Sequence, residues 1–366
     1  MRILVAPDSF KGTATAAQAA TAIAAGWRSV RPADTVLELP LADGGEGSAA
    51  VIRASTPGAS EIRCRATGPD GILVDAGWLL LPDGTAVVEL AAASGLTLMR
   101  RKDALGAQTT GFGEQLAAAA RDPRVRRIVA TVGGSAATDG GAGALSALGA
   151  RFLDPAGKPL GPGGGMLNRC ARVDVSALVP PPRGGVQVLT DVTAPLLGPR
   201  GAAAVFGPQK GATADDVTLL EASLARLAAV IGGEPDQAGA GAAGGAAFGL
   251  ATLWNARLEP GARLIGEVVG LSGAVDRSDL VITGEGRFDA QSTTGKVVGH
   301  VLGTVAGQRV LLIAGQIDRA LPAGIERAVE LCRLAGSGDR AMVDAQRWLR
   351  AAGAELSAAT AADCRP

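Results

Sequence analysis

The chain has 366 residues, and its 35 Lys and Arg balance its 35 Asp and Glu, so the formal net charge is zero. This balance argues against broad electrostatic binding to nucleic acid or to an anionic membrane surface. With one histidine, no tyrosine and four cysteines that form no C-x-x-C pair, the composition also disfavours chemistry that needs several His ligands, a Tyr acid or a zinc site.

Periodicity and turn residues predict secondary structure along most of the chain. In chain order the sequence predicts a strand at 2–6, a helix at 13–30, a strand at 35–41, a strand pair at 61–90, a helix at 109–121, strands at 127–132 and 185–192, a helix at 214–231, and strands at 279–283 and 309–314. Thr15 and Gln18 have the spacing of a helix capping box, and Gly232 is a helix stop signal. This alternation predicts an α/β fold with a doubly wound parallel sheet.

The length favours two domains, at roughly 100–200 residues per domain. The strand pair and the Gly- and Pro-rich stretch at 152–202 break the alternation, so we expect a second α/β domain inserted into the first. The expected first domain comprises 1–58, 103–150 and 267–366, and the inserted domain comprises 59–102 and 151–266. The N-terminus does not read as a signal peptide, and no run of 18 apolar residues occurs, so a cytoplasmic protein without a membrane span is expected.

Glycine-rich segments after predicted strands hold the candidate site residues, because glycine lets backbone amides approach an anion. Two such segments lie near the N-terminus and supply Asp8, Ser9 and Lys11, then Asp43, Gly44, Gly45 and Glu46. In a doubly wound sheet, ligands bind outside the carboxyl ends of the strands, where Lys11 suits an anion and the carboxylates suit a base or a metal-bound ligand. Ordinary turns and helix-capping loops are the alternative interpretation.

Three further segments have the same character. They supply Gly133, Gly134, Ser135, Thr138 and Asp139, then Asp191, Arg200 and Lys210, and finally Glu285, Arg287, Asp289 and Lys296. The first of these suits a phosphate cradle but is not a Walker A sequence, and the others mix carboxylates with cations as phosphoryl transfer requires. Structural or solvated surface loops remain the alternative. Three of only five lysines, at 11, 210 and 296, fall in these segments.

One motif is weak. The glycines at 239, 241 and 244 match G-x-G-x-x-G, but no strand pattern precedes them, so we expect a glycine-rich helix start or loop instead. A nicotinamide-dependent dehydrogenase is therefore disfavoured, and His300 is not expected to be catalytic. A catalytically silent ligand sensor is the other alternative, and the charge-rich segments disfavour it.

Taken together, APDSFKG, PLADGGEG, VGGSAATDGGAG, DVTAPLLGPRGAAAVFGPQKGA, GAGAAGG and ITGEGRFDAQSTTGK resemble the bacterial glycerate kinase family in this order. The resemblance runs from Ile3 to about Asp318. It implies a flavodoxin-like domain interrupted by a restriction-endonuclease-like domain. It also implies phosphorylation of D-glycerate by ATP with Mg²⁺, with 2-phosphoglycerate favoured over 3-phosphoglycerate as product. A homodimer stays open.

On this resemblance we expect in-line phosphoryl transfer in a cleft between the domains. Lys11, Asp191 and Asp289 are the predicted catalytic residues, and the two aspartates are the predicted Mg²⁺ ligands or bases. The predicted substrate-binding residues are Asp8, Ser9, Asp43, Gly44, Gly45, Glu46, Arg200, Lys210, Arg287 and Lys296. The predicted phosphate- or nucleotide-binding residues are Gly133, Gly134, Ser135, Thr138, Asp139 and Glu285.

Overall fold

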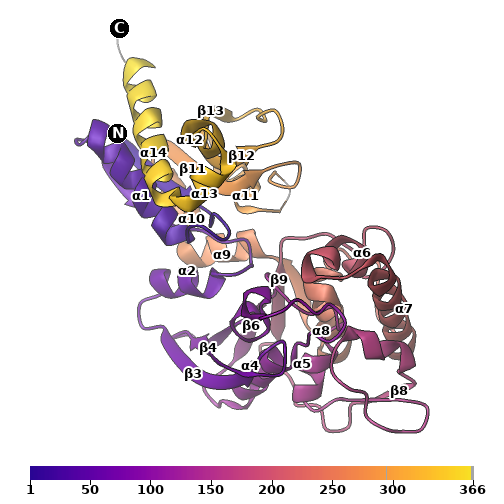
Figure 1. Ribbon diagram of the computed structural model, residues 1–366. Helices are drawn as coiled ribbons and strands as arrows, with labels where there is room; N and C mark the ends of the chain where they lie inside the picture. Colours follow the sequence, from indigo (N-terminus) through magenta and orange to yellow (C-terminus); the bar gives the residue numbers. More distant parts are fainter. Residues whose placement is uncertain (294, 364–366) are drawn as a thin grey trace. The chain divides into compact units, whose positions relative to one another are not determined.

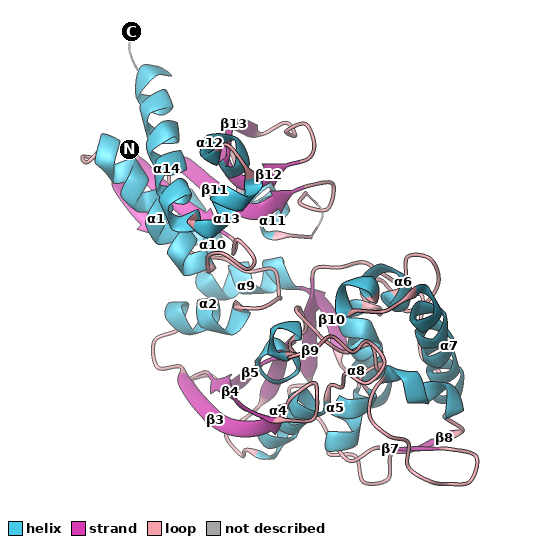
Figure 2. Ribbon diagram, viewed as in Figure 1, coloured by secondary structure: helices cyan, strands magenta, loops and turns pink. Residues whose placement is uncertain are grey.

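The computed structural model describes residues 1–293 and 295–363; Thr294, in the last of the predicted segments, and Cys364 lie outside this part. The chain divides into two compact units, which we call unit 1 and unit 2 (Figures 1 and 2). Unit 1 comprises 1–43, 50–55 and the chain from 260 onward, and unit 2 comprises 44–49 and 56–259. Helix α2 (Ser48–Ser55) crosses the division.

Unit 1 is built on a five-stranded sheet. Its strands are β1 (Arg2–Pro7), β2 (Thr35–Glu38), β11 (Leu280–Phe288), β12 (Arg309–Ile317) and β13 (Ile325–Glu330). They lie in the order β2-β1-β11-β12-β13, and every neighbouring pair is parallel. Numbered within the unit this is 2-1-3-4-5, the flavodoxin-like order. The predicted doubly wound parallel sheet is confirmed.

Helices cover both faces of this sheet (Figure 1). One face packs against α1 (Ala16–Val30), α12 (Leu331–Ala335), α13 (Gly338–Val343) and α14 (Ala345–Asp363). The other packs against α9 (Gly261–Val269), α10 (Leu271–Asp276) and α11 (Val297–Thr304). Successive strand residues point to opposite faces, so Ile3 and Val5 enter the first core and Leu4 and Ala6 the second. This double burial explains the continuous apolar runs.

Helix α1 begins as its sequence predicts. The Thr15 hydroxyl accepts a hydrogen bond from the Gln18 amide, and the Gln18 side chain accepts one from the Thr15 amide, so the capping box is confirmed. Helix α1 then lies against α14, the last helix of the chain (Figure 1). The C-terminal segment therefore completes the core that the N-terminal strand and helix begin.

Unit 2 has a six-stranded mixed sheet in the order β10-β9-β6-β5-β4-β3. These strands are β3 (Ser60–Thr67), β4 (Leu73–Leu80), β5 (Thr85–Glu89), β6 (Arg127–Thr131), β9 (Val186–Thr190) and β10 (Arg257–Pro260). The pairs β3/β4 and β4/β5 are antiparallel, whereas β5/β6 and β6/β9 are parallel. A separate hairpin consists of β7 (Arg151–Leu153) and β8 (Arg172–Asp174).

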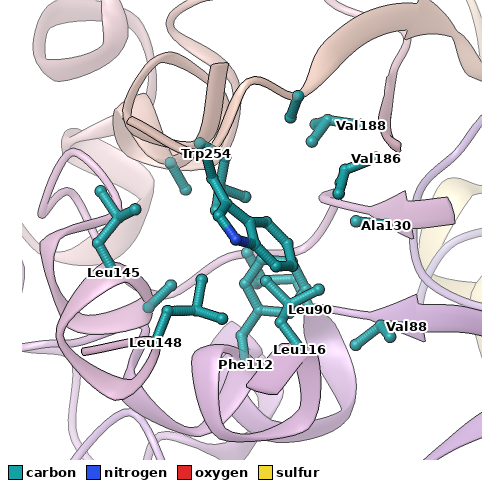
Figure 3. Close-up of a cluster of buried hydrophobic side chains, with 14 of the residues drawn as sticks. Val88, Leu90, Phe112, Leu116, Ala130, Leu145, Leu148, Val186, Val188 and Trp254 are labelled. Carbon is teal, nitrogen blue, oxygen red and sulfur yellow. The ribbon is translucent and has the colours of Figure 1, made fainter. Parts of the chain in front are cut away.

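The main helices of unit 2 pack around a large core next to the sheet and a smaller core that holds the buried side of α6 and most of that of α7. They are α3 (Ala91–Ser94), α4 (Thr110–Arg121), α5 (Ala142–Ala147), α6 (Ala202–Phe206), α7 (Ala214–Ile231) and α8 (Ala246–Trp254). Figure 3 shows the Trp254 ring among leucines of α5 and its C-terminal end and the valines of the sheet. The indole nitrogen of Trp254 donates to the Val179 carbonyl at 2.8 Å, so its polar edge is satisfied. The predicted helix at 214–231 has the predicted bounds.

The predicted boundaries are wrong for 103–150, which lies in unit 2. The reason is β6: it pairs with β5 and β9 in the six-stranded sheet, not with β1 or β11. A strand buried on both faces has the same apolar pattern in either sheet, so its sequence does not indicate which strands pair with it. The G-x-G-x-x-G glycines lead through a short turn of 3₁₀-helix (Ala242–Gly245) into α8, as expected of a helix start.

Candidate active site

A pocket of about 400 Å³ lies at the carboxyl ends of the strands of unit 1. Eight predicted site residues line it: Asp8, Ser9, Lys11, Asp43, Glu285, Arg287, Asp289 and Lys296. In a doubly wound sheet the strand order reverses between the first strand and its central neighbour, here β1 and β11, and ligands bind at that point. The N-terminal and the C-terminal predicted segments are therefore brought together at one site.

Two buried carboxylates stand in register at this point. Pro7 pairs with Gly284 in the parallel register of β1 and β11, so Asp8 and Glu285 follow at adjacent positions. Glu285 is only 6% exposed, and its Oε1 atom is buried with no hydrogen-bond partner among the described residues. An unpaired buried acceptor is costly, which marks this atom as one that a ligand or a proton satisfies.

Burial and crowding alter the acidity of both groups. Burial, followed by the neighbouring carboxylate of Asp43, raises the pKa of Asp8 well above its ordinary value. Burial raises the pKa of Glu285 to about 7, and the charges of Asp289 and Asp43 add to the effect. A carboxyl group with a pKa near neutrality is suited to take and release a proton under physiological conditions.

Cations flank these carboxylates. The Lys11 side chain is 68% exposed, and its Nζ lies 3.5 Å from Oδ2 of Asp43. Lys296 is the N-cap residue of α11, and its charge acts on Glu285. Arg287 donates through Nε to Asp318. These charges give the pocket a means to attract an anionic substrate.

The segment at 283–292 is folded differently from the loop that the sequence suggests. Strand β11 continues through Glu285 and Arg287 to Phe288, and only then turns. At the turn, the Asp289 amide donates to the Ser292 hydroxyl at 2.9 Å, and the Gln291 amide donates to Asp289 Oδ1 at 2.8 Å. The rigid strand therefore fixes Glu285, and the turn fixes Asp289.

The remaining predicted residues lie in unit 2, where two glycine segments pack against each other. A Cβ atom on Gly133 would come 2.3 Å from the Gly45 Cα, so only glycine permits this approach. The Ser135 hydroxyl accepts from the Ala137 amide at 3.2 Å within its own loop. The loop at 133–141 and the loop at 44–47 are thus in close contact, and both are largely buried.

Asp139 and Lys210 stabilise the loop at 133–141 through buried hydrogen bonds. Asp139 is fully buried, and its carboxylate accepts hydrogen bonds from Thr109, Gly141 and Gly143 at 2.8 to 3.1 Å. Lys210 is 2% exposed, and its amine donates to the Ala137 carbonyl and to the Thr138 hydroxyl. Burial lowers the pKa of Lys210 to about 8, and Asp139 opposes this shift. Both residues hold the loop in place from within.

The structure adds one residue that the sequence interpretation missed. Glu89, at the end of β5, accepts hydrogen bonds from the Gly47 and Ala49 amides at 2.9 and 3.0 Å. Burial raises the pKa of its carboxyl group, and the charge of Glu46 adds to the effect. An acidic residue at a strand end was the available signal. Asp191 and Arg200 follow β9 in the same unit, and Arg200 is exposed.

A magnesium ion would find limited protein coordination. Among residues 1–293 and 295–363, no group of three or more His, Cys, Asp or Glu side chains is arranged to hold a metal ion. Mg²⁺ commonly binds through one or two carboxylates together with substrate phosphates. Asp289, which lines the pocket, has the right donor chemistry for this mode.

Within the same described residues, no helix has the length and apolarity to span a bilayer.

Comparison with known proteins identifies the family of the chain. The sequence model of the glycerate kinase family matches residues 3–361. The chain belongs to this family. A glycerate kinase of Bacillus subtilis is 44% identical over 330 residues, which cover 87% of this chain and 86% of the relative. A glycerate 2-kinase of Escherichia coli K12 is 42% identical over 306 residues, covering 81% of this chain and 80% of the relative.

A solved structure extends the likeness to the fold. A crystal structure described as a glycerate kinase 2 from Salmonella typhimurium LT2 superposes with a TM-score of 0.79 at 36% identity, covering 99% of both chains. The family resemblance drawn from the glycine-rich segments and the interrupted α/β fold are thereby confirmed. Membership of the glycerate kinase family also favours a kinase over the dehydrogenase and sensor alternatives.

Proposed function

We propose that this protein transfers the γ-phosphoryl group of ATP to a hydroxyl of D-glycerate. The observation that carries the proposal is the pocket of unit 1, where the three buried carboxylates of Asp8, Asp43 and Glu285 meet three cationic side chains at the switch point of the sheet. Family membership supplies the substrate class. The name of the Escherichia coli relative, glycerate 2-kinase, favours 2-phosphoglycerate as the product.

The residues of the pocket divide the chemistry between them. Lys11, Arg287 and Lys296 bind the glycerate carboxylate and the phosphates, because cations offset the charge of these anions. The hydroxyl oxygen of glycerate attacks the γ-phosphorus in line, and ADP leaves. The hydroxyl proton passes to Glu285, whose unpaired Oε1 and pKa of about 7 suit an acceptor, with Asp8 beside it in register.

This assignment moves the base from Asp191 or Asp289 to Glu285. Asp289, in the pocket of unit 1, is retained as a residue that would hold Mg²⁺, which supplies neutralisation of phosphate charge when it is bound, and Asp191 in unit 2 is retained as a separate candidate ligand. In unit 2, the glycine-rich loops offer backbone amides to phosphate, with Asp139 and Lys210 as positioning residues. The alternative function of a silent sensor predicts ligand binding without turnover.

A coupled assay of ADP release with D-glycerate tests the proposal. Turnover with D-glycerate supports it, and NMR of the product distinguishes phosphorylation at O2 from O3. Binding of D-glycerate without ADP release would overturn it in favour of a sensor. Asp191→Asn and Asp289→Asn, made separately, test the metal assignment: we expect each to raise the Mg²⁺ concentration needed for half-maximal activity, and wild-type behaviour of both would contradict it.

A further inference from the structure

The pocket of unit 1 changes character along the edge of the sheet. Residues that follow or end β2, β1 and β11 contribute carboxylates and cations, as described above. The lining from the C-terminal segment, beyond β12, carries no charge: it consists of Leu331, Cys332, Gly338, Ala341, Met342 and Ala345. The pocket therefore has a charged half and a half that is mostly apolar.

The apolar half is too far from the carboxylates to serve a three-carbon acid. Neighbouring strands are about 4.8 Å apart, so the end of β13 lies roughly 10 Å from Glu285 on β11. Pockets of ~300–1,000 Å³ enclose ligands of drug size. A volume of about 400 Å³ is therefore much larger than glycerate needs. The pocket has room for a larger ligand beside glycerate.

The wall of this half is fixed in place but presents an exposed apolar side chain. Leu331, Ala341 and Ala345 belong to the same buried core as Phe10. Met342 stands between them in sequence, lines the pocket, and is 58% exposed. A methionine side chain is flexible, and its sulfur makes favourable contacts with aromatic rings. A flat heterocycle is a suitable occupant.

We propose that the apolar half binds the nucleoside of ATP, with its base against Met342 and its phosphates directed toward Lys11 and Lys296. This inference rests on the proposed kinase function. Apart from Ser9 and Thr13, which follow β1, the uncharged polar side chains that line the pocket are Gln316, which donates to Asp318 at 2.7 Å, and Cys332. With so few groups to read the edge of the base, the subsite discriminates weakly between adenine and other nucleobases.

Two variants of α13 test the subsite. Met342→Asp removes the apolar contact and is expected to raise both the Kd of a fluorescent mant-ATP and the KM for ATP by about tenfold or more, with the KM for glycerate unchanged. Val343→Asp is the matched control, because Val343 is 89% exposed and does not line the pocket. It should leave both constants at the wild-type level. Equal effects of the two variants, or no effect of Met342→Asp, would overturn the inference.

Modification of Cys332 gives a readout that does not depend on turnover. A bulky maleimide should label this half-buried thiol, and ATP should slow the labelling severalfold whereas glycerate should not. Cys332→Ser identifies the labelled site. Protection by glycerate alone would contradict the assignment. Because nucleotide binding is measured directly, failure of the subsite and failure of the kinase activity are separate results.

Discussion

At the scale of single residues, the notable feature is a carboxyl group whose pKa is raised to about 7, so that both its charged and its neutral forms are populated near neutral pH. Glu285 sits on a rigid strand, is nearly inaccessible, and has an oxygen without a partner. Such a group costs stability when it is charged, so its presence at the switch point of the sheet indicates a functional demand. The role of Glu285 in catalysis can be separated from its effect on folding. A neutral replacement should abolish proton transfer, whereas it should remove the destabilising effect of the buried charge.

Glu285→Gln is expected to lower kcat by about 100-fold or more, since a general base contributes on the order of 10²–10⁴. The stability of the fold should respond in the opposite sense. The pKa of Glu285 is raised from 4.5 to about 7, so its contribution to stability is fully present below pH 4.5 and is lost as the pH rises through 7. The variant should lose this pH dependence, on the order of 1–3 kcal/mol between pH 5 and 8.

ADP release and denaturant unfolding at the two pH values measure both effects. Glu355→Gln, at an exposed position on α14, serves as the control and should change neither quantity. A Glu285→Gln enzyme with wild-type kcat would show that another group accepts the proton.

The lysines of the glycine-rich segments differ in a way that the sequence does not reveal. Lys11→Arg should fold like the wild type, because its side chain is 68% exposed. Lys210→Arg should lose about 1–3 kcal/mol of unfolding free energy, since a larger planar group must enter a full interior at 2% exposure. Urea denaturation of the two variants compares them directly. Equal stability of the two would contradict the supporting role of Lys210.

At the scale of elements, the glycine-rich loops act in pairs. In unit 2 the loop at 133–141 contacts the loop at 44–47, and buried hydrogen bonds of Asp139 and Lys210 stabilise the first loop. Segments that are distant in sequence are therefore in direct contact. A displacement of one loop should therefore also displace the other.

Gly133→Ala tests this coupling. A methyl group 2.3 Å from the Gly45 backbone forces the loops apart, so kcat/KM should fall at least tenfold, with a loss of about 1–3 kcal/mol in stability. Gly161→Ala is the control, since a Cβ there meets nothing within 4 Å. Measurements of kcat/KM and unfolding free energy separate a local displacement from general destabilisation. Unchanged kinetics in Gly133→Ala would refute a functional contact between these loops.

Local features of these elements were predictable, and pairings were not. The capping box at Thr15 and the bounds of α7 follow from short-range spacing, which the sequence carries directly. The glycines at 284 and 286 suggested that β11 would stop early, yet the strand continues to Phe288 because β12 pairs with it as far as Ile317. Tertiary pairing thus overrides a local turn signal.

At the scale of the whole molecule, the chain order of the two units explains the remaining error. The segments of unit 1 are separated by most of unit 2, and both sheets contain apolar parallel strands. Placing 103–150 required knowledge of which strands pair with β6. For the site, residue types and their positions after strands predicted the charged side chains that line the pocket in unit 1, but not its apolar lining. The burial of Lys210 and the role of Glu89 depend on packing that no local pattern encodes.

This chain order also predicts independent folding of unit 2. Its sheet and its core come almost entirely from 56–259, with 44–49 added, so a fragment of residues 44–260 contains every strand of the six-stranded sheet. A chain of this size buries enough apolar surface to be stable alone. The fragment is expected to unfold cooperatively in urea and to keep the near-ultraviolet dichroism of the buried Trp78 and Trp254.

A fragment of residues 1–150 is the control and should not fold, because it lacks β11, which pairs with β1 in one sheet, and β9, which pairs with β6 in the other. Loss of cooperative unfolding in the 44–260 fragment would show that unit 2 depends on unit 1 for its stability.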